Sequence, residues 1–210
     1  MTPTPSDPAQ RSTPKRLRRL VDAPALAGQA VTLLCSPDAL FTMTIDDARC
    51  IVGYMSLLSY AKGATLLREG DPRDGKAGPD ANELLLILEG QVSVDLGLES
   101  RSGGVAIASL GPGSFLGEVS ALDGLPRSAQ CTAVSPVHTA RLSQASLQVM
   151  LDAHPREASK LMAALARCIA ERLRATGQQL QAYDQLAAGL QAEVARLQAE
   201  VARLRAASRP

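Results

Sequence analysis

The stretch from Phe115 to Ala129 carries the side chains whose types and spacing best suit a ligand. It contains one acid, Glu118, one base nine positions later, Arg127, and a hydroxyl donor, Ser128. An arginine offers a planar fork of N–H donors that matches phosphate oxygens. An ionised carboxylate only accepts hydrogen bonds, so it suits sugar hydroxyls. Gly117 precedes a predicted helical turn, whose first N–H groups favour an anion. Together these groups suit a nucleotide with a free 2′-hydroxyl and a compact phosphate.

The order of these residues resembles the phosphate-binding cassette of cyclic-nucleotide-binding domains. The family pattern is roughly Phe-Gly-Glu, a short helix, and then Pro-Arg followed by Ser, Ala or Thr and by Ala. Gly117-Glu118 and Pro126–Ala129 match it, whereas Leu116, which follows Phe115, departs from it. The alternative interpretation is a Glu–Arg pair on the surface beside a turn, which is a common and energetically weak feature.

The resemblance implies a role for each matched residue. Glu118 would bind the ribose 2′-hydroxyl and Arg127 the cyclic phosphate, while Ser128 and the backbone N–H of Gly117 would complete the phosphate shell. Ser128 favours cyclic AMP over cyclic GMP, because a Thr there often accompanies cyclic GMP in this family. Cyclic di-GMP is a further alternative, against which the intact Glu118 argues. The expected ligand-binding residues are Gly117, Glu118, Val119, Ser120, Pro126, Arg127, Ser128 and Ala129.

Composition argues against several other classes of protein. The formal net charge is +1, so the chain as a whole is not drawn to nucleic acid or acidic membranes. No stretch reaches the ~18 apolar residues that a membrane span needs. No nucleophile and base lie at a readable spacing, because His138 is on a predicted strand and His154 precedes a proline; this argues against an enzyme. No CxxC-type spacing occurs, so we expect no metal site. Cysteines scattered singly along the chain suit a reducing compartment, so we expect a cytoplasmic location. The cysteines are Cys35, Cys50, Cys131 and Cys168.

The elements that must position the cassette are those of an α+β protein. We expect an antiparallel β-roll or jelly roll, because short apolar segments alternate with glycine-containing turns. Gly63, Gly70 and Gly90 lie where tight turns need positive φ. Thr44 and Asp47 predict a capping box. The expected helices are 25–34, 45–55, a helix from 144 and a long helix from 155; the expected strands are 64–67, 84–88, 92–96, 105–110, 129–133 and 137–142.

We divide the chain into three parts. Residues 1–24 are rich in Pro, Ser, Thr and Arg, which predicts a disordered basic tail. Residues 25–176 are expected to form the cyclic-nucleotide-binding domain with its flanking helices. Residues 177–210 are expected to form a C-terminal coiled coil. The tail is interpreted as a solvated terminus, the alternative being contact with an acidic partner or nucleic acid.

The coiled coil is predicted from heptads. Residues 190–196 repeat residue for residue at 197–203, with Val194 and Val201 at position a and leucines at d. A β-branched residue at a with Leu at d favours a parallel two-stranded coiled coil. The alternative is an amphipathic helix packed on its own domain. Gly177 weakens the helix and is a candidate hinge.

These features predict a regulatory protein. We expect a cyclic-nucleotide sensor, with cyclic AMP the favoured ligand, that signals to an unidentified partner protein through a ligand-responsive homodimer. The alternative is a transcription regulator of the catabolite activator type that has lost or never had its DNA-binding domain. Residues 178–210 are occupied by the heptads, which run to Leu204, and leave no room for a helix-turn-helix. We therefore expect no sequence-specific DNA binding.

Overall fold

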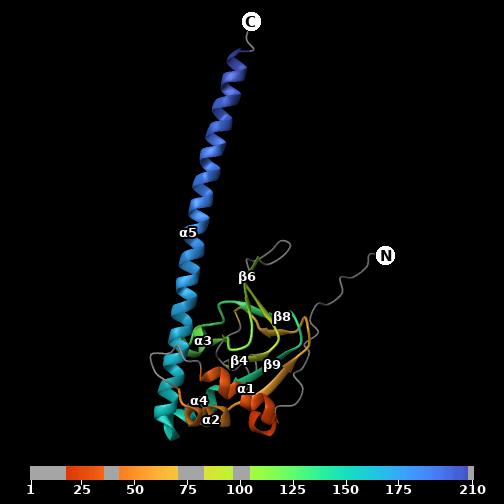
Figure 1. The fold of residues 1–210 in the computed structure, drawn as a ribbon, viewed down its shortest axis with the longest axis vertical. Helices are drawn as coiled ribbons and strands as arrows, with labels where there is room; N and C mark the ends of the chain where they lie inside the picture. Colours follow the sequence, from red (N-terminus) through yellow and green to blue (C-terminus); the bar gives the residue numbers. More distant parts are fainter. Residues whose placement is uncertain (1–17, 36–42, 71–82, 97–104, 208–210) are drawn as a thin grey trace, which may run out of the picture. The chain divides into compact units, whose positions relative to one another are not determined.

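The computed structural model describes residues 18–35, 43–70, 83–96 and 105–207 (Figure 1). Residues 1–17, which make up most of the predicted basic tail, lie outside the described residues. The part of the tail that is described, residues 18–24, contains a short strand and a turn of 3-10 helix, within which Leu20 is completely buried.

The strands form two antiparallel sheets, as the sequence predicts. One sheet has the order β1-β2-β9-β4-β7 and the other has the order β3-β8-β5-β6. The predicted segments agree with the observed strands to within one residue at each end, and β1, β2 and β7 are added to them. The strands are β1 (Arg18–Arg19), β2 (Ser56–Tyr60), β3 (Thr65–Leu67), β4 (Leu84–Glu89), β5 (Val92–Leu96), β6 (Val105–Leu110), β7 (Phe115–Leu116), β8 (Gln130–Ala133) and β9 (Val137–Leu142).

The helices flank these sheets. Figure 1 shows α1, α2 and α4 gathered at one end of the strands. Gly63, Gly70 and Gly90 have φ values of 83°, 73° and 90°, which confirms the predicted turns. The helices are η1 (Leu20–Asp22), α1 (Pro24–Leu34), α2 (Ile45–Gly53), α3 (Glu118–Asp123), α4 (Gln144–Ala153) and α5 (Pro155–Ala207).

Strand β4 separates two hydrophobic clusters. Leu84, Leu86 and Leu88 alternate along the strand and pack in a cluster with residues of the helices. Leu85 and Ile87 point to the other face and pack in a second cluster with residues of the four-stranded sheet. Because successive side chains of a strand point to opposite faces, this alternation also decides which residues beside β4 face the interior of the roll.

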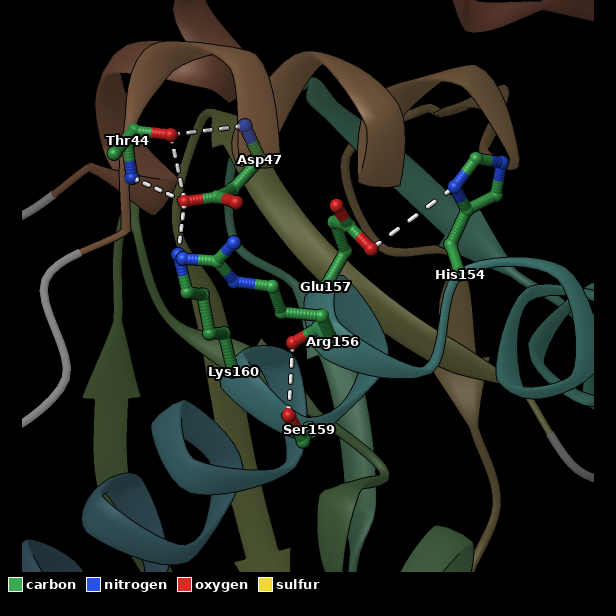
Figure 2. A network of polar contacts seen from close by, with 7 residues as sticks. All are labelled: Thr44, Asp47, His154, Arg156, Glu157, Ser159 and Lys160. Atoms are coloured by element: carbon green, nitrogen blue, oxygen red, sulfur yellow. Dashed lines mark hydrogen bonds and ion pairs between the residues drawn. The ribbon is translucent and has the colours of Figure 1, made fainter.

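The first turn of α2 is bound to the first turns of α5 (Figure 2). The predicted capping box is confirmed: Thr44 Oγ1 accepts from the Asp47 backbone N–H at 3.2 Å, and Asp47 Oδ2 accepts from the Thr44 N–H at 2.7 Å. The same carboxylate forms a partly buried ion pair with Lys160. The hydrogen bonds from Lys160 and Thr44 outweigh the cost of burial and lower the pKa of Asp47 from 3.8 to about 2.

One detail of α2 differs from the helical periodicity of its sequence, which places Ile45, Ala48, Val52 and Met55 on one apolar face. Ala48, Val52 and Met55 are buried, but Ile45 is 56% exposed and Ile51 is buried instead. Ile45 is the first residue of the helix, one position after the cap Thr44, so it lies at the end of the packed face.

The chain divides into two compact units, residues 1–167 and residues 168–210, and α5 contributes to both. In the second unit the described side chains from Leu173 onward are exposed, including the apolar residues at heptad positions a and d. The most exposed of these are Leu173, Leu180, Tyr183, Leu190, Val194, Leu197, Val201 and Leu204.

Candidate ligand site

The predicted cassette is built around the short helix α3. Strand β7 ends at Leu116, and Gly117 then caps the helix with a left-handed φ of 80°. The helix ends at a second left-handed residue, Gly124, with φ 74°. Glycine adopts this conformation without the steric cost that a β-carbon brings. The sequence therefore makes a sharp entry into and exit from a single helical segment before the chain reaches Arg127.

Arg127 is fixed at both its backbone and its guanidinium group, and it is only 5% exposed. Its Nη1 donates to the backbone oxygen of Gly117 at 3.0 Å, and its Nη2 donates to the backbone oxygen of Glu83 at 2.8 Å. Its own backbone oxygen accepts from the N–H of Gly70 at 2.9 Å. The planar fork therefore has a defined orientation before any ligand is considered.

Four buried charged side chains lie in the cassette or are connected to it through Arg127. Glu83, Glu118, Arg127 and Arg141 are each less than a tenth exposed. Glu83 forms an ion pair with Arg141, both of whose side chains are buried. Two acids and two bases balance in formal charge, and buried charges are tolerated when they are paired and hydrogen-bonded.

The residues expected at the site differ in exposure. Glu118, Ser120 and Arg127 are buried, whereas Gly117 and Ala129 are partly buried. The remaining members are exposed: Val119, Pro126 and Ser128. The hydrogen bond from Arg127 to Gly117 brings the two ends of the predicted cassette together.

Sequence reasoning missed Glu83 and Arg141. Glu83 lies 44 positions before Arg127, so no local spacing connects them. A weak signal was nevertheless present. Arg141 lies between the apolar residues Ala140 and Leu142 of β9, and Glu83 immediately precedes the apolar run of β4. Charged residues in such positions are rarely buried unless they are paired.

A second polar cluster lies across β2, β9 and β4. Ser59 Oγ lies 2.8 Å from Nδ1 of His138, and Nε2 of His138 lies 3.9 Å from Oε2 of Glu89. The residue types are those of a hydrolytic triad, but there the serine faces Nε2 and the acid orients Nδ1. The His–Glu distance is also longer than a hydrogen bond. The arrangement therefore does not activate Ser59 as a nucleophile.

Other chemistry receives little support from the described part of the chain. Burial raises the pKa of the Cys35 and Cys50 thiols, the carboxylate of Asp47 adding to the effect in both. These thiols are therefore weak nucleophiles near neutral pH. Within the described residues, no cluster of three His, Cys, Asp or Glu side chains could hold a metal ion. Over the same residues, no helix combines the length and apolar character that crossing a membrane requires.

Comparison with known proteins finds a matching domain family over part of the chain. Residues 57–154 match the model of the cyclic nucleotide-binding domain. A solved cyclic nucleotide-binding domain from Methylobacillus flagellatus is 29% identical with a TM-score of 0.65, and the match covers 75% of this chain and 83% of that one. The catabolite activator protein of Thermus thermophilus is 26% identical with a TM-score of 0.52, over 71% of this chain and 62% of that one.

A longer protein also contains a similar region. Glutaminase 2 of Bradyrhizobium diazoefficiens is 36% identical over 130 residues, which are 62% of this chain but 19% of that protein. The chain thus spans less than a fifth of the length of this relative.

Proposed function

We propose, from the premise that residues 57–154 form a regulatory domain of the cyclic nucleotide-binding family, that this chain is a sensor of a cyclic nucleotide. The observation that carries the proposal is the placement of Arg127. Its guanidinium is buried and held by two backbone oxygens, that of Gly117 within the cassette and that of Glu83 beside β4. A surface Glu–Arg pair beside a turn does not need such a fixed, buried arginine.

In this proposal Arg127 binds the cyclic phosphate and Glu118 accepts a hydrogen bond from the ribose 2′-hydroxyl. A charge-assisted contact between a guanidinium and a phosphate is strong and directional. The carboxylate of Glu118 suits a hydroxyl donor and repels a phosphate, so the two residues orient the ligand. Ser128, which is exposed, adds a hydroxyl to the phosphate shell. The other contacts come from Gly117, Val119, Ser120, Pro126 and Ala129.

We further propose that the chain binds cyclic AMP in preference to cyclic GMP, because position 128 carries a Ser and not a Thr. Cyclic di-GMP is the competing ligand, and Glu118 is the residue that argues against it. We also place the sensor in the cytoplasm, because its cysteines are scattered singly along the chain.

The signal is proposed to leave through a homodimer. The apolar a and d residues of the second unit are exposed along α5, from Leu180 at 69% to Leu204 at 61%. A long apolar stripe of this kind needs a partner surface, and the heptads fit a second copy of the same helix in parallel. Ligand can change the dimer only if it binds one arrangement better than another. A partner protein would then recognise the changed surface.

The second candidate function is transcription regulation, and the likeness to the catabolite activator protein of Thermus thermophilus favours it. In the described residues after His154 the chain forms the single helix α5, with no turn that would separate a recognition helix. We therefore expect only weak, salt-sensitive retention of duplex DNA, through the basic N-terminal residues. A salt-resistant, sequence-dependent shift would favour the second function.

The proposal is tested by calorimetric titration of cyclic AMP into Arg127→Ala and Glu118→Ala variants. Each lost contact is charge-assisted and contributes on the order of 1.5–3 kcal/mol, so each variant should bind roughly tenfold more weakly or worse. Arg49→Ala is the control, because it removes an exposed arginine that forms an ion pair with Asp46 on the surface. If both cassette variants bind like wild type, the site is wrong.

A further inference from the structure

We infer that Glu83 and Arg141 are positioning residues that hold Arg127 in its phosphate-binding orientation; the inference rests on the proposed function of Arg127. Glu83 uses two different groups for two arginines. Its carboxylate forms the buried ion pair with Arg141, and its backbone oxygen accepts from Nη2 of Arg127 at 2.8 Å. Any force that fixes Glu83 therefore also fixes one arm of the Arg127 fork.

The position of the Glu83 backbone oxygen is only partly set by the sheet. Glu83 lies one residue before β4, whose first paired residue is Leu84, opposite Leu142. Arg141 is paired with Leu85, the next residue along β4, so its side chain can reach back to Glu83. The ion pair thus extends the link between β4 and β9 by one residue, to the residue that carries the oxygen.

The pair lies on the interior face of the roll. Glu83 and Leu85 are two residues apart at β4, and Val137 and Arg141 lie on the same face of β9. Leu85 and Val137 both belong to the second hydrophobic cluster. An ion pair in such surroundings is costly to form and is strongly destabilising to break on one side only. Retention of the pair beside the cassette is explained if it holds the oxygen that orients Arg127.

A positioning role and a purely electrostatic role predict opposite effects. Neutralising Glu83 removes a negative charge near the proposed phosphate site, which by itself would strengthen binding of an anion. Loss of a fixed carbonyl would instead let the Arg127 fork turn away and weaken binding. The sign of the change in affinity therefore separates the two roles.

The experiment uses the full chain with Glu83→Gln and, separately, with Glu83→Met and Arg141→Met together. The double variant removes both charges at once, which is tolerated far better than removal of one. Calorimetric titration should show that each variant binds cyclic AMP roughly five- to tenfold more weakly, because Nη2 of Arg127 is no longer held by a fixed backbone oxygen. Lys160→Gln is the matched control, because it converts one member of the partly buried ion pair with Asp47 to an amide and should leave affinity within about twofold of wild type.

The same changes are then made in an Arg127→Ala background. If Glu83 and Arg141 act through Arg127, the double methionine change should cause no further loss of affinity there. A loss of the same size in both backgrounds would overturn the inference, as would wild-type affinity in the Glu83→Gln and double methionine variants.

A second readout needs no ligand. In protein with labelled arginine, the two Nη groups of Arg127 should give separate, slowly exchanging NMR signals in wild type, because each donates to a different backbone oxygen. Both pair variants should broaden or merge these signals, whereas Lys160→Gln should not. Unchanged Arg127 signals in the variants would overturn the inference. Failure of wild type to bind any cyclic nucleotide would instead sink the proposed function, while the NMR comparison still decides whether the pair positions Arg127.

Discussion

The guanidinium of Arg127 lies in the space that a side chain at Gly117 would need. A β-carbon at position 117 would lie 2.1 Å from Nη1 of Arg127 and 2.6 Å from the backbone oxygen of Glu83. Gly117 therefore serves two purposes. It adopts a left-handed φ of 80°, and it leaves room for the arginine that the proposed ligand needs.

We predict that Gly117→Ala weakens cyclic AMP binding at least about tenfold, because the β-carbon must displace the Arg127 fork from its charge-assisted contact. The variant should also lose on the order of 1–2 kcal/mol of folding stability through left-handed strain. Calorimetric titration and thermal unfolding measure the two effects. Gly63→Ala is the control, since Gly63 has a similar φ of 83° but nothing lies within 4 Å of its β-carbon position. Equal effects of both substitutions on affinity would refute the steric account.

The role of Glu118 is tested on the ligand as well as on the protein. Wild type should bind 2′-deoxy cyclic AMP roughly tenfold more weakly than cyclic AMP, because the carboxylate loses its hydroxyl donor. In Glu118→Ala the two nucleotides should bind alike. A 2′-deoxy penalty that persists in the variant would show that another residue binds the ribose hydroxyl.

Stability should depend on pH through Asp47. Its pKa in the folded protein is lowered from 3.8 to about 2, so the unfolded chain binds a proton more readily. The stabilisation, about 2 kcal/mol by linkage, is complete above the unfolded pKa and is lost as pH falls towards 2. Asp47→Asn should therefore flatten the fall in unfolding free energy between about pH 5 and pH 2.

The control for this measurement is Asp46→Asn, which changes a neighbouring carboxylate whose side chain is 93% exposed. Denaturant titrations of the three proteins at each pH give the comparison. The assignment to Asp47 fails if Asp46→Asn flattens the curve as much as Asp47→Asn does.

The heptads predict a parallel dimer that persists without ligand. Replacing Leu190, Leu197 and Leu204 with Gln should give monomers that still bind cyclic AMP, since these residues are exposed in the isolated chain. Ala192→Gln and Ala199→Gln, on the opposite side of the heptad, should leave the dimer intact. Light scattering with and without cyclic AMP makes the comparison. A wild-type monomer in both conditions, or cross-links that join opposite ends of the helices, would contradict the parallel dimer.

Features that depend on neighbours in the chain could be predicted from the sequence. The capping box of Thr44 and Asp47 needs only a spacing of three residues, and the turn at Gly63 needs only one residue with positive φ. The strand segments follow from apolar runs between such turns. The antiparallel roll was therefore predictable in outline.

Features that depend on strand pairing could not be predicted in this way. The cassette residues Glu118 and Arg127 were visible because they lie close together in sequence. The oxygen that fixes Arg127 belongs to Glu83, 44 positions away, and the partner of Glu83 lies on another strand. Only the register of β4 against β9 brings these groups together.

The most direct measurement is calorimetric titration of the wild-type chain with cyclic AMP, cyclic GMP and cyclic di-GMP under identical conditions. The account predicts saturable binding of one cyclic AMP per chain, with weaker binding of cyclic GMP and still weaker binding of cyclic di-GMP. Saturable binding of cyclic di-GMP in preference to both mononucleotides, or no binding of any of the three, would contradict it.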